Sequence, residues 1–250
     1  MITIKNKKAA EKMAIAGKKL SLVFKEISEI IVSGITTLEL DNSIEQRLNA
    51  LQLIPQTKGY MGYKHATCIS INNEIVHGVP SAEKVLKNGD LVKVDVCAAW
   101  GGYCADMTRC FFVGDERSSQ AQNLVDVANA SLEAGIKKAV VGGRLTDISA
   151  AIEQEIKKSG FGIVEDFAGH GIGKKMHEDP EILNYGEPGM GPVIKAGMAF
   201  AIEPMITLGN PRVKMLRDGW TAVTADGSLA AHVEDTVFIT DEGPLVLTRG

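Results

Sequence analysis

Residues 91–113 of the chain read LVKVDVCAAWGGYCADMTRCFFV. Two strongly apolar runs, 91–99 and 103–113, flank the glycines after Trp100, and this pattern predicts a β-hairpin. Each run carries one acid, Asp95 or Asp106. A two-residue turn at 100–101 would place the two carboxylates directly opposite each other, and a turn at 101–102 would make them diagonal neighbours on one face. A three-residue turn would separate them.

Burying the two acids would cost free energy, because an unpaired carboxylate is unfavourable in an apolar strand. Like charges brought together on one face repel each other unless a proton or a cation lies between them. The alternative is that Asp106 is an ordinary hairpin acid and that Asp95 pairs with Lys93 or Arg109.

Around this hairpin, apolar spacing and capping residues predict four helices, over residues 7–32, 36–51, 119–141 and 146–158. Thr36 and Glu39 form a capping-box pattern at the start of the second helix, and Gly34 is the predicted stop of the first. We expect a short hairpin with strands at 68–71 and 75–77, an extended segment at 162–167, and strands at 198–207, 221–224 and 232–240.

The order of these elements, two helices and then strands, occurs twice. Residues 87–95 and 195–203 share a lysine, a glycine two residues later and an acid eight residues later, at an offset of 108. Val32, Gly34 and Thr37 match Val141, Gly143 and Thr146 at an offset of 109. We therefore expect a single domain built from two pseudo-symmetric halves, approximately 1–115 and 116–250, with the functional site between them.

Composition excludes several other classes of protein. The 27 basic and 31 acidic residues give a net charge of −4, which argues against nucleic acid as the main ligand. No apolar run approaches the roughly 18 residues of a membrane span, and no signal peptide is recognisable, so we expect a cytoplasmic protein. Four cysteines without C-x-x-C spacing favour a reducing compartment. The lysine-rich first 25 residues predict a solvated helix face, with contact to a polyanion as the alternative.

Two further acids lie in apolar contexts, Glu203 in MAFAIEPM and Glu234 in HVEDTVFI. His170 lies in the glycine-rich segment GHGIG, and His177 and His77 are further candidates. Each residue alone is more often structural. Together, four carboxylates and a histidine favour Mn²⁺, Fe²⁺ or Co²⁺ over a structural zinc, and their number favours two ions and hydrolytic chemistry. No G-x-S-x-G, Walker or dinucleotide-binding motif offers a competing chemistry.

These residues match a known metal-site signature in order and spacing. Asp95, Asp106, the segment 169–173, His177, the segment 202–205 and Glu234 resemble the signature of the methionine aminopeptidases of the pita-bread family. The resemblance covers essentially the whole chain, whose short length is similar to the compact bacterial type I form. It implies an α+β pita-bread fold, in which two pseudo-symmetric halves of antiparallel strands are backed by helices.

The resemblance also implies roles for the site residues. Two divalent ions, of cobalt, manganese, iron or zinc, would be held with Asp95 on one ion, His170 and Glu203 on the other, and Asp106 and Glu234 bridging them. A hydroxide between the ions would attack the scissile carbonyl, with Glu203 as proton acceptor. His177 would polarise that carbonyl, and His77 would contact the nitrogen of the scissile amide.

The implied substrate is the N-terminal methionine of peptides and nascent chains whose second residue is small. Tyr60, Tyr63, Cys68 and Trp220 match the methionine pocket, although ordinary core packing is an alternative explanation for them. We expect a monomer with no membrane contact and with a transient ribosome contact. The chain departs from the family pattern at four positions, namely Met176, Cys97, His232 and Asp235.

Three other functions are compatible with parts of the sequence. An aminopeptidase P or prolidase would need a proline-binding surface and usually carries an additional N-terminal domain. A non-catalytic binding protein of the same fold, associated with the ribosome through the lysine-rich N-terminus, would have lost metal ligands, whereas all five are present here. A two-metal phosphoesterase would need an arginine or lysine clamp beside the acids, and none is recognisable.

Overall fold

The structure is a computed structural model that describes residues 1–250. It contains four α-helices: α1 (Lys7–Ile27), α2 (Thr37–Ala50), α3 (Ser119–Lys138) and α4 (Leu145–Lys157). A short 3₁₀ turn spans Tyr60–Gly62. No helix combines the length and the apolar character that crossing a membrane requires.

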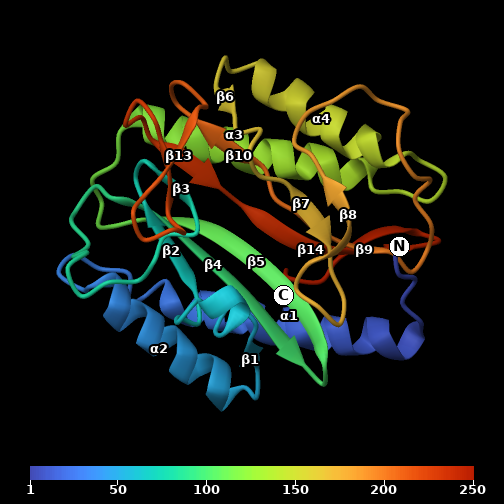
Figure 1. The fold of residues 1–250 in the computed structure, drawn as a ribbon, viewed down its shortest axis with the longest axis horizontal. Helices are drawn as coiled ribbons and strands as arrows, with labels where there is room; N and C mark the ends of the chain where they lie inside the picture. The colour runs from blue at the N-terminus through green and yellow to red at the C-terminus, as the bar shows by residue number, and fades with distance from the viewer.

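Nine strands form one large antiparallel sheet that curves through the molecule (Figure 1). Its order is β1-β4-β5-β14-β9-β7-β8, with β2 on β4 and β15 on β14. The strands are β1 (Ile54–Pro55), β2 (Cys68–Ile71), β4 (Leu91–Trp100), β5 (Tyr103–Phe112), β7 (Gly169–Gly171), β8 (Glu178–Ile182), β9 (Ala199–Ile202), β14 (Glu234–Thr240) and β15 (Gly243–Val246).

Two small antiparallel sheets complete the fold. One has the order β13-β10-β6 and the other the order β11-β12-β3. Their strands are β3 (Glu74–Val76), β6 (Gly162–Ile163), β10 (Met205–Thr207), β11 (Val213–Met215), β12 (Ala222–Thr224) and β13 (Ala230–His232).

The β4–β5 hairpin turns at Gly101 and Gly102, both with positive φ, and its last pair is Trp100 with Tyr103. Asp95 is therefore paired with Thr108, and Asp106 is paired with Cys97. This is the register expected for a two-residue turn at 101–102. It makes the two acids diagonal neighbours on one face of the sheet.

Helices cover the face of the hairpin that lies away from the acids. Val92, Val94 and Val96 belong to one core cluster with buried residues of α1 and α2, such as Leu20 and Leu40. Because side chains alternate along a strand, Lys93, Asp95 and Cys97 point to the opposite face. A second core cluster joins α3 and α4 to β9 and β14, so helices back both ends of the curved sheet (Figure 1).

Two of the predicted helix boundaries need correction. The first helix ends at Ile27 rather than near residue 32, and residues 28–30 form a tighter turn in which the Ile30 amide donates to the carbonyl of Ile27. The third ends at Lys138 rather than 141. The capping box of Thr36 and Glu39 is present as predicted.

Three strand predictions were wrong. The expected strand 232–240 is interrupted at Val233, and its two parts belong to β13 in a small sheet and β14 in the large one. The expected hairpin at 68–77 does not form, because β2 pairs with β4 while β3 pairs with β12 in another sheet. The expected strand 198–207 is broken after Ile202, and its two parts, β9 and β10, belong to different sheets. The break coincides with Glu203 and Pro204, and proline cannot donate a ladder hydrogen bond.

Two isolated β-bridges support the proposal of two related halves. One joins Thr36 to Val85 and the other joins Arg144 to Val193. Both residues of the second bridge lie 108 positions after those of the first, which is the offset of the repeat in the sequence. We propose that residues 1–115 and 116–250 are these halves of a single catalytic domain.

Gly17 in α1 provides a test of the packing between the two chain ends. A Cβ atom there would lie 2.3 Å from the carbonyl oxygen of Leu247, whose amide is bonded to the carbonyl of Thr236. We expect Gly17→Ala to lower the free energy of unfolding by about 1–3 kcal/mol, despite a gain of roughly 1 kcal/mol in helix propensity. Urea unfolding measures this change. Lys18→Ala, at the next and exposed position, is the control and should change stability by less than about 0.5 kcal/mol.

Candidate metal centre

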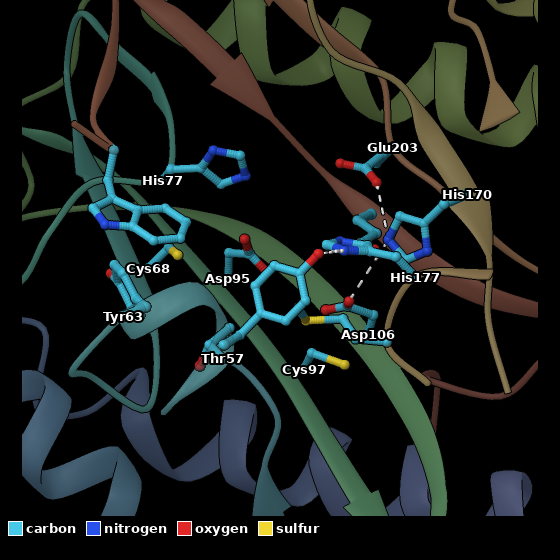
Figure 2. A pocket seen from close by; sticks show the side chains of 14 residues that line it. Thr57, Tyr63, Cys68, His77, Asp95, Cys97, Asp106, His170, His177 and Glu203 are labelled. Carbon is cyan, nitrogen blue, oxygen red and sulfur yellow. Dashed lines mark hydrogen bonds and ion pairs between the residues drawn. The ribbon is translucent and has the colours of Figure 1, made fainter. Parts of the chain in front are cut away.

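One pocket on the open face of the large sheet contains all five predicted metal ligands (Figure 2). Four come from different strands: Asp95 from β4, Asp106 from β5, His170 from β7 and Glu234 from β14. Glu203 lies at the break between β9 and β10. The sheet thus brings together side chains that lie up to 139 positions apart in the sequence, between Asp95 and Glu234.

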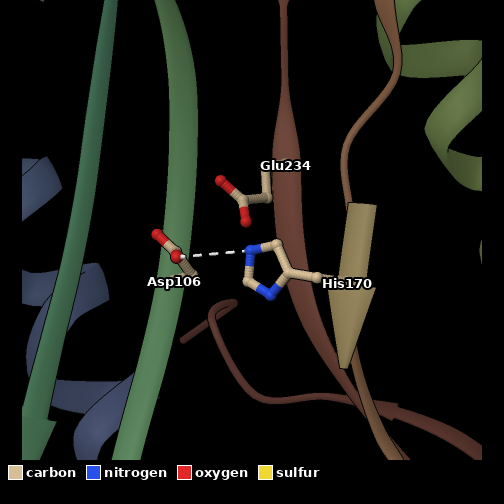
Figure 3. A group of neighbouring side chains, drawn as sticks. All are labelled: Asp106, His170 and Glu234. Atoms are coloured by element: carbon tan, nitrogen blue, oxygen red, sulfur yellow. Dashed lines mark ion pairs between the residues drawn. The ribbon is translucent and has the colours of Figure 1, made fainter. Parts of the chain in front are cut away.

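Four of the five predicted ligands have donor atoms within the range of a shared ion, whereas Asp95 belongs to neither of the two ligand groups. His170 Nε2 is 3.5 Å from Glu203 Oε1 and 3.9 Å from Asp106 Oδ2. Asp106, His170 and Glu234 form one group whose ligand atoms all lie within 4.8 Å of one another (Figure 3). Glu203, His232 and Glu234 form a second such group, so Glu234 is common to both.

Burial controls the protonation of the acids. It raises the pKa of Asp95 to about 8 and the pKa of Asp106 to about 7, and repulsion between neighbouring carboxylates adds to both shifts. Burial also raises the pKa values of Glu203 and Glu234 well above their usual range. In the absence of a cation, these carboxyl groups therefore retain protons near neutral pH.

Burial has the opposite effect on the histidines. It lowers the pKa values of His77, His170 and His232 to about 4, and it lowers the pKa of His177. These imidazoles are therefore neutral at pH 7, which is the form that binds metals.

The residues fit a divalent metal centre. Glu234 Oε2 accepts a hydrogen bond of 2.8 Å from the Thr108 hydroxyl, but Glu234 Oε1 and His232 Nε2 are buried without any hydrogen-bond partner. Such atoms are rare unless an ion or a water completes them. Carboxylate oxygens with imidazole nitrogens are suitable donors for Mn²⁺, Fe²⁺, Co²⁺ or Zn²⁺.

The alternative pairing of Asp95 with Lys93 or Arg109 is wrong. Lys93 Nζ donates to the backbone carbonyl of Asn72 at 2.8 Å. Arg109 alternates with Thr108 along β5, so its side chain leaves the pocket face and binds Asp235 at 2.6 Å. Neither cation neutralises Asp95.

The two other histidines predicted for the site, His177 and His77, lie beside the acid cluster (Figure 2). The His177 ring packs edge-on against the His170 ring at 4.5 Å between centroids, and its Nδ1 is 3.2 Å from the Tyr60 hydroxyl. His77 has a φ of 58°, a costly backbone conformation for a residue with a side chain. Strain of this kind is often found at functional sites.

Aromatic and sulfur-containing side chains form the other part of the pocket. Tyr63 packs edge-on against Trp220 at 5.0 Å, and its buried hydroxyl donates to the carbonyl of Thr67. Cys68 completes this group, and burial raises the pKa of its thiol, so the sulfur stays neutral. Tyr60, Tyr63, Cys68 and Trp220 thus line the same pocket as the acids.

The structure adds residues that were not predicted as site residues. Thr57, Cys97 and Met176 also line the pocket, and Phe167 packs against His77 at 5.3 Å. His232 belongs to the second ligand group. No periodic signal in the sequence marks it, because His232 ends β13 of a small sheet whereas Glu234 begins β14 of the large one. Thr57 and Phe167 lie in irregular chain and gave no such signal.

The raised carboxyl pKa values predict how stability depends on pH. The folded, metal-free protein holds more protons on Asp95 and Asp106 than the unfolded chain does, so these groups make stability fall as pH rises toward 8. The buried histidines oppose this trend only below about pH 6.5, the pKa of an unfolded histidine. We expect the melting temperature of the metal-free protein to fall between pH 6.5 and pH 8.

Thermal unfolding followed by circular dichroism at both pH values measures this. Mn²⁺ should restore the melting temperature, and its effect should be larger at pH 8, because fewer protons must then be displaced. A metal-free protein that becomes more stable from pH 6.5 to pH 8 would contradict the assignment of these buried acids.

Comparison with known proteins agrees with this site. Residues 11–241 match metallopeptidase family M24. A methionine aminopeptidase of Clostridium acetobutylicum is 46% identical over 248 residues, which cover 99% of both chains. The crystal structure of a methionine aminopeptidase from Thermotoga maritima has 44% identity and a TM-score of 0.97, with all of both chains covered.

A more distant likeness shows the same fold. A prolidase from Pyrococcus furiosus has 25% identity and a TM-score of 0.77, with 99% of this chain and 65% of the prolidase covered. The expected α+β pita-bread fold, with antiparallel strands backed by helices, is confirmed. The chain is a metallopeptidase and therefore a hydrolase, and it belongs to family M24 and to the methionine aminopeptidases within it.

Proposed function

We propose that the protein hydrolyses the N-terminal methionine from peptides and nascent chains whose second residue is small. The observation that carries this proposal is the composition of one pocket, which combines a buried cluster of four carboxylates and an imidazole with a group of aromatic and sulfur side chains. A hydrolytic centre and a surface suited to a thioether side chain are thus adjacent. The names of the bacterial relatives support the same activity.

Five residues would hold two divalent ions. We assign Asp95 to one ion, His170 and Glu203 to the other, and Asp106 and Glu234 to both. When bound, ions of cobalt, manganese, iron or zinc would polarise the scissile carbonyl and lower the pKa of a water so that it can act as the nucleophile. Their affinity for this donor set comes from buried oxygen and nitrogen atoms that lack other partners.

Glu203 is the proposed proton acceptor. Its carboxylate lies within the acid cluster, 3.5 Å from His170 Nε2, and would be ionised once ions displace the protons of the cluster, so it can accept a proton. As the water oxygen bonds to the carbonyl carbon, Glu203 takes one proton of that water. It then returns the proton to the amide nitrogen as the carbon–nitrogen bond breaks, so that free methionine and a shortened peptide leave.

His177 and His77 act on the substrate. The Tyr60 hydroxyl and the His170 ring hold the neutral His177 imidazole at the edge of the acid cluster, where it can donate to the carbonyl oxygen as negative charge develops. His77 is fixed between Phe167 and Trp220 and would contact the nitrogen of the scissile amide. Both are proposed catalytic residues.

Tyr60, Tyr63, Cys68 and Trp220 are the proposed contacts of the methionine side chain. Aromatic faces and a neutral thiol interact favourably with a thioether and offer little to a charged side chain. The buried Tyr63 hydroxyl is already satisfied by backbone carbonyls, so the ring presents an apolar surface.

We also propose that the protein acts as a monomer in the cytoplasm, where nascent chains present their first residue. All four cysteines are free, as suits a reducing compartment. For a transient ribosome contact, the available basic residues of the N-terminal region are Lys7, Lys8 and Lys18, which are exposed. Others are engaged, since Lys12 and Lys19 donate to backbone carbonyls and Lys5 pairs with Glu178.

A peptide series at fixed Co²⁺ tests the proposed specificity. We expect release of free methionine from Met-Ala-Ser and little release from Met-Trp-Ser, in which the second residue is large. Gly-Pro-Ser is the control for proline-directed cleavage and should remain intact. Cleavage of the Gly-Pro bond alone would contradict the proposal and favour a prolidase-type activity, and failure to cleave any peptide would favour a binding protein.

A further inference from the structure

His232 stands out among the buried polar residues of the site. Its side chain is only 2% exposed, and its Nε2 has no hydrogen-bond partner. The five assigned ligands do not include it, and the chain departs from the family pattern at this position. A buried imidazole nitrogen without a partner is costly, so its surroundings should explain it.

The fold holds His232 against the acid cluster from a fixed direction. His232 is the last residue of β13 and pairs with Met205 of β10, just beyond the break that contains Glu203. Its backbone carbonyl also accepts a hydrogen bond from the Cys110 thiol. The imidazole therefore approaches Glu203 and Glu234 from the small sheet, whereas His170 approaches from the large one.

The distances match those between two ligands of one ion. His232 Nε2 lies 3.2 Å from Glu203 Oε2 but does not form a hydrogen bond with it. Two donor atoms that each lie about 2.1 Å from a shared ion are about 3.0–3.4 Å apart in octahedral or tetrahedral geometry. Glu234 Oε1, another buried atom without a partner, belongs to a residue of the same group.

We propose that His232 is an additional nitrogen ligand of the metal centre, on the ion assigned to His170, Glu203 and Glu234. This inference rests on the proposed dimetal function. It gives that ion a second imidazole, because His232 groups with Glu203 and Glu234. Because imidazole favours cobalt and zinc whereas oxygen donors suit manganese, the second imidazole should shift the preference of the centre toward Co²⁺ over Mn²⁺.

Metal affinity of the purified, metal-stripped protein tests this inference without reference to turnover. Isothermal titration with Co²⁺ and with Mn²⁺ is compared between wild type and His232→Gln. Glutamine keeps an amide oxygen near the site but removes the nitrogen donor. We expect the Co²⁺ affinity to fall about tenfold or more and the Mn²⁺ affinity to fall less than about threefold. His65→Gln, at a histidine outside the pocket that contacts Asp41, is the matched control and should change neither.

The outcomes distinguish the ligand role of His232 from the dimetal function of the whole centre. Equal losses for both ions, or no loss, would overturn the ligand assignment of His232. A wild-type protein that binds neither ion would overturn the proposed dimetal function itself. The X-ray absorption spectrum of the Co²⁺-loaded wild type needs no variant: about one imidazole per ion supports the inference, and about half as many contradicts it.

Discussion

Replacing Glu203 with glutamine is expected to lower kcat for Met-Ala-Ser by about 10²–10⁴-fold, the usual contribution of a positioned proton acceptor. Glutamine has nearly the same shape and keeps one oxygen for a metal ion, but its amide cannot take a proton from water. The ability of the Glu203 carboxylate to accept a proton is the property that this change removes. Methionine release at saturating Co²⁺ measures the effect.

The control separates the loss of proton transfer from the loss of fold. Glu187→Gln changes an exposed glutamate outside the pocket and should leave kcat within about twofold of wild type, as expected for a surface substitution. Circular dichroism should show an unchanged fold for both variants. A Glu203→Gln variant with at least half of the wild-type kcat would show that another group accepts the proton.

Replacing Asp235 with asparagine is expected to lower the free energy of unfolding by about 3–5 kcal/mol, the cost of breaking a buried ion pair. Asp235 is fully buried. Its carboxylate accepts hydrogen bonds from Arg109 at 2.6 Å, from the Thr248 hydroxyl at 2.6 Å and from Arg249 at 2.6 and 2.8 Å. Asparagine would leave two guanidinium groups without their common partner.

This network ties β14 to β5 and to the chain end, and it explains why an acid is tolerated at a position where the chain departs from its family. Urea unfolding of the metal-free protein measures the change. Asp126→Asn is the control, because Asp126 is a helix acid whose only side-chain hydrogen bond is an exposed one to Gln122, and it should cost less than about 0.5 kcal/mol. A loss below about 1 kcal/mol for Asp235→Asn would show that the arginines find other partners.

Local pattern predicted the elements that have strong periodicity. The four helices and the β4–β5 hairpin were identified because apolar spacing, the capping box at Thr36 and the Gly101-Gly102 turn are local signals. The pairing of β3 with β12 was missed, because partners such as Val76 and Ala222, which lie 146 positions apart, leave no local trace. Strand β7 was missed because Gly-His-Gly has no strand propensity and depends on β8 and β9.

The acids of this cluster could be identified from the sequence because acids in apolar strands are costly unless something compensates them. The sequence could not show how they group. Two sets that share Glu234, and an imidazole from His232 in one of them, result from the meeting of a large and a small sheet at the Glu203-Pro204 break. Whether a strand continues or changes sheet at this point depends on distant partner strands. The periodicity of one strand therefore could not predict the break.

If this pocket is a two-metal centre that releases N-terminal methionine, its activity must depend on bound metal. The most direct test removes metal from the purified protein with a chelator and follows free methionine from Met-Ala-Ser as Mn²⁺ or Co²⁺ is added back. We expect no release from the stripped protein and a rate that rises with added metal and saturates near two equivalents per chain. Full activity without metal, or no activity with either metal, would contradict it.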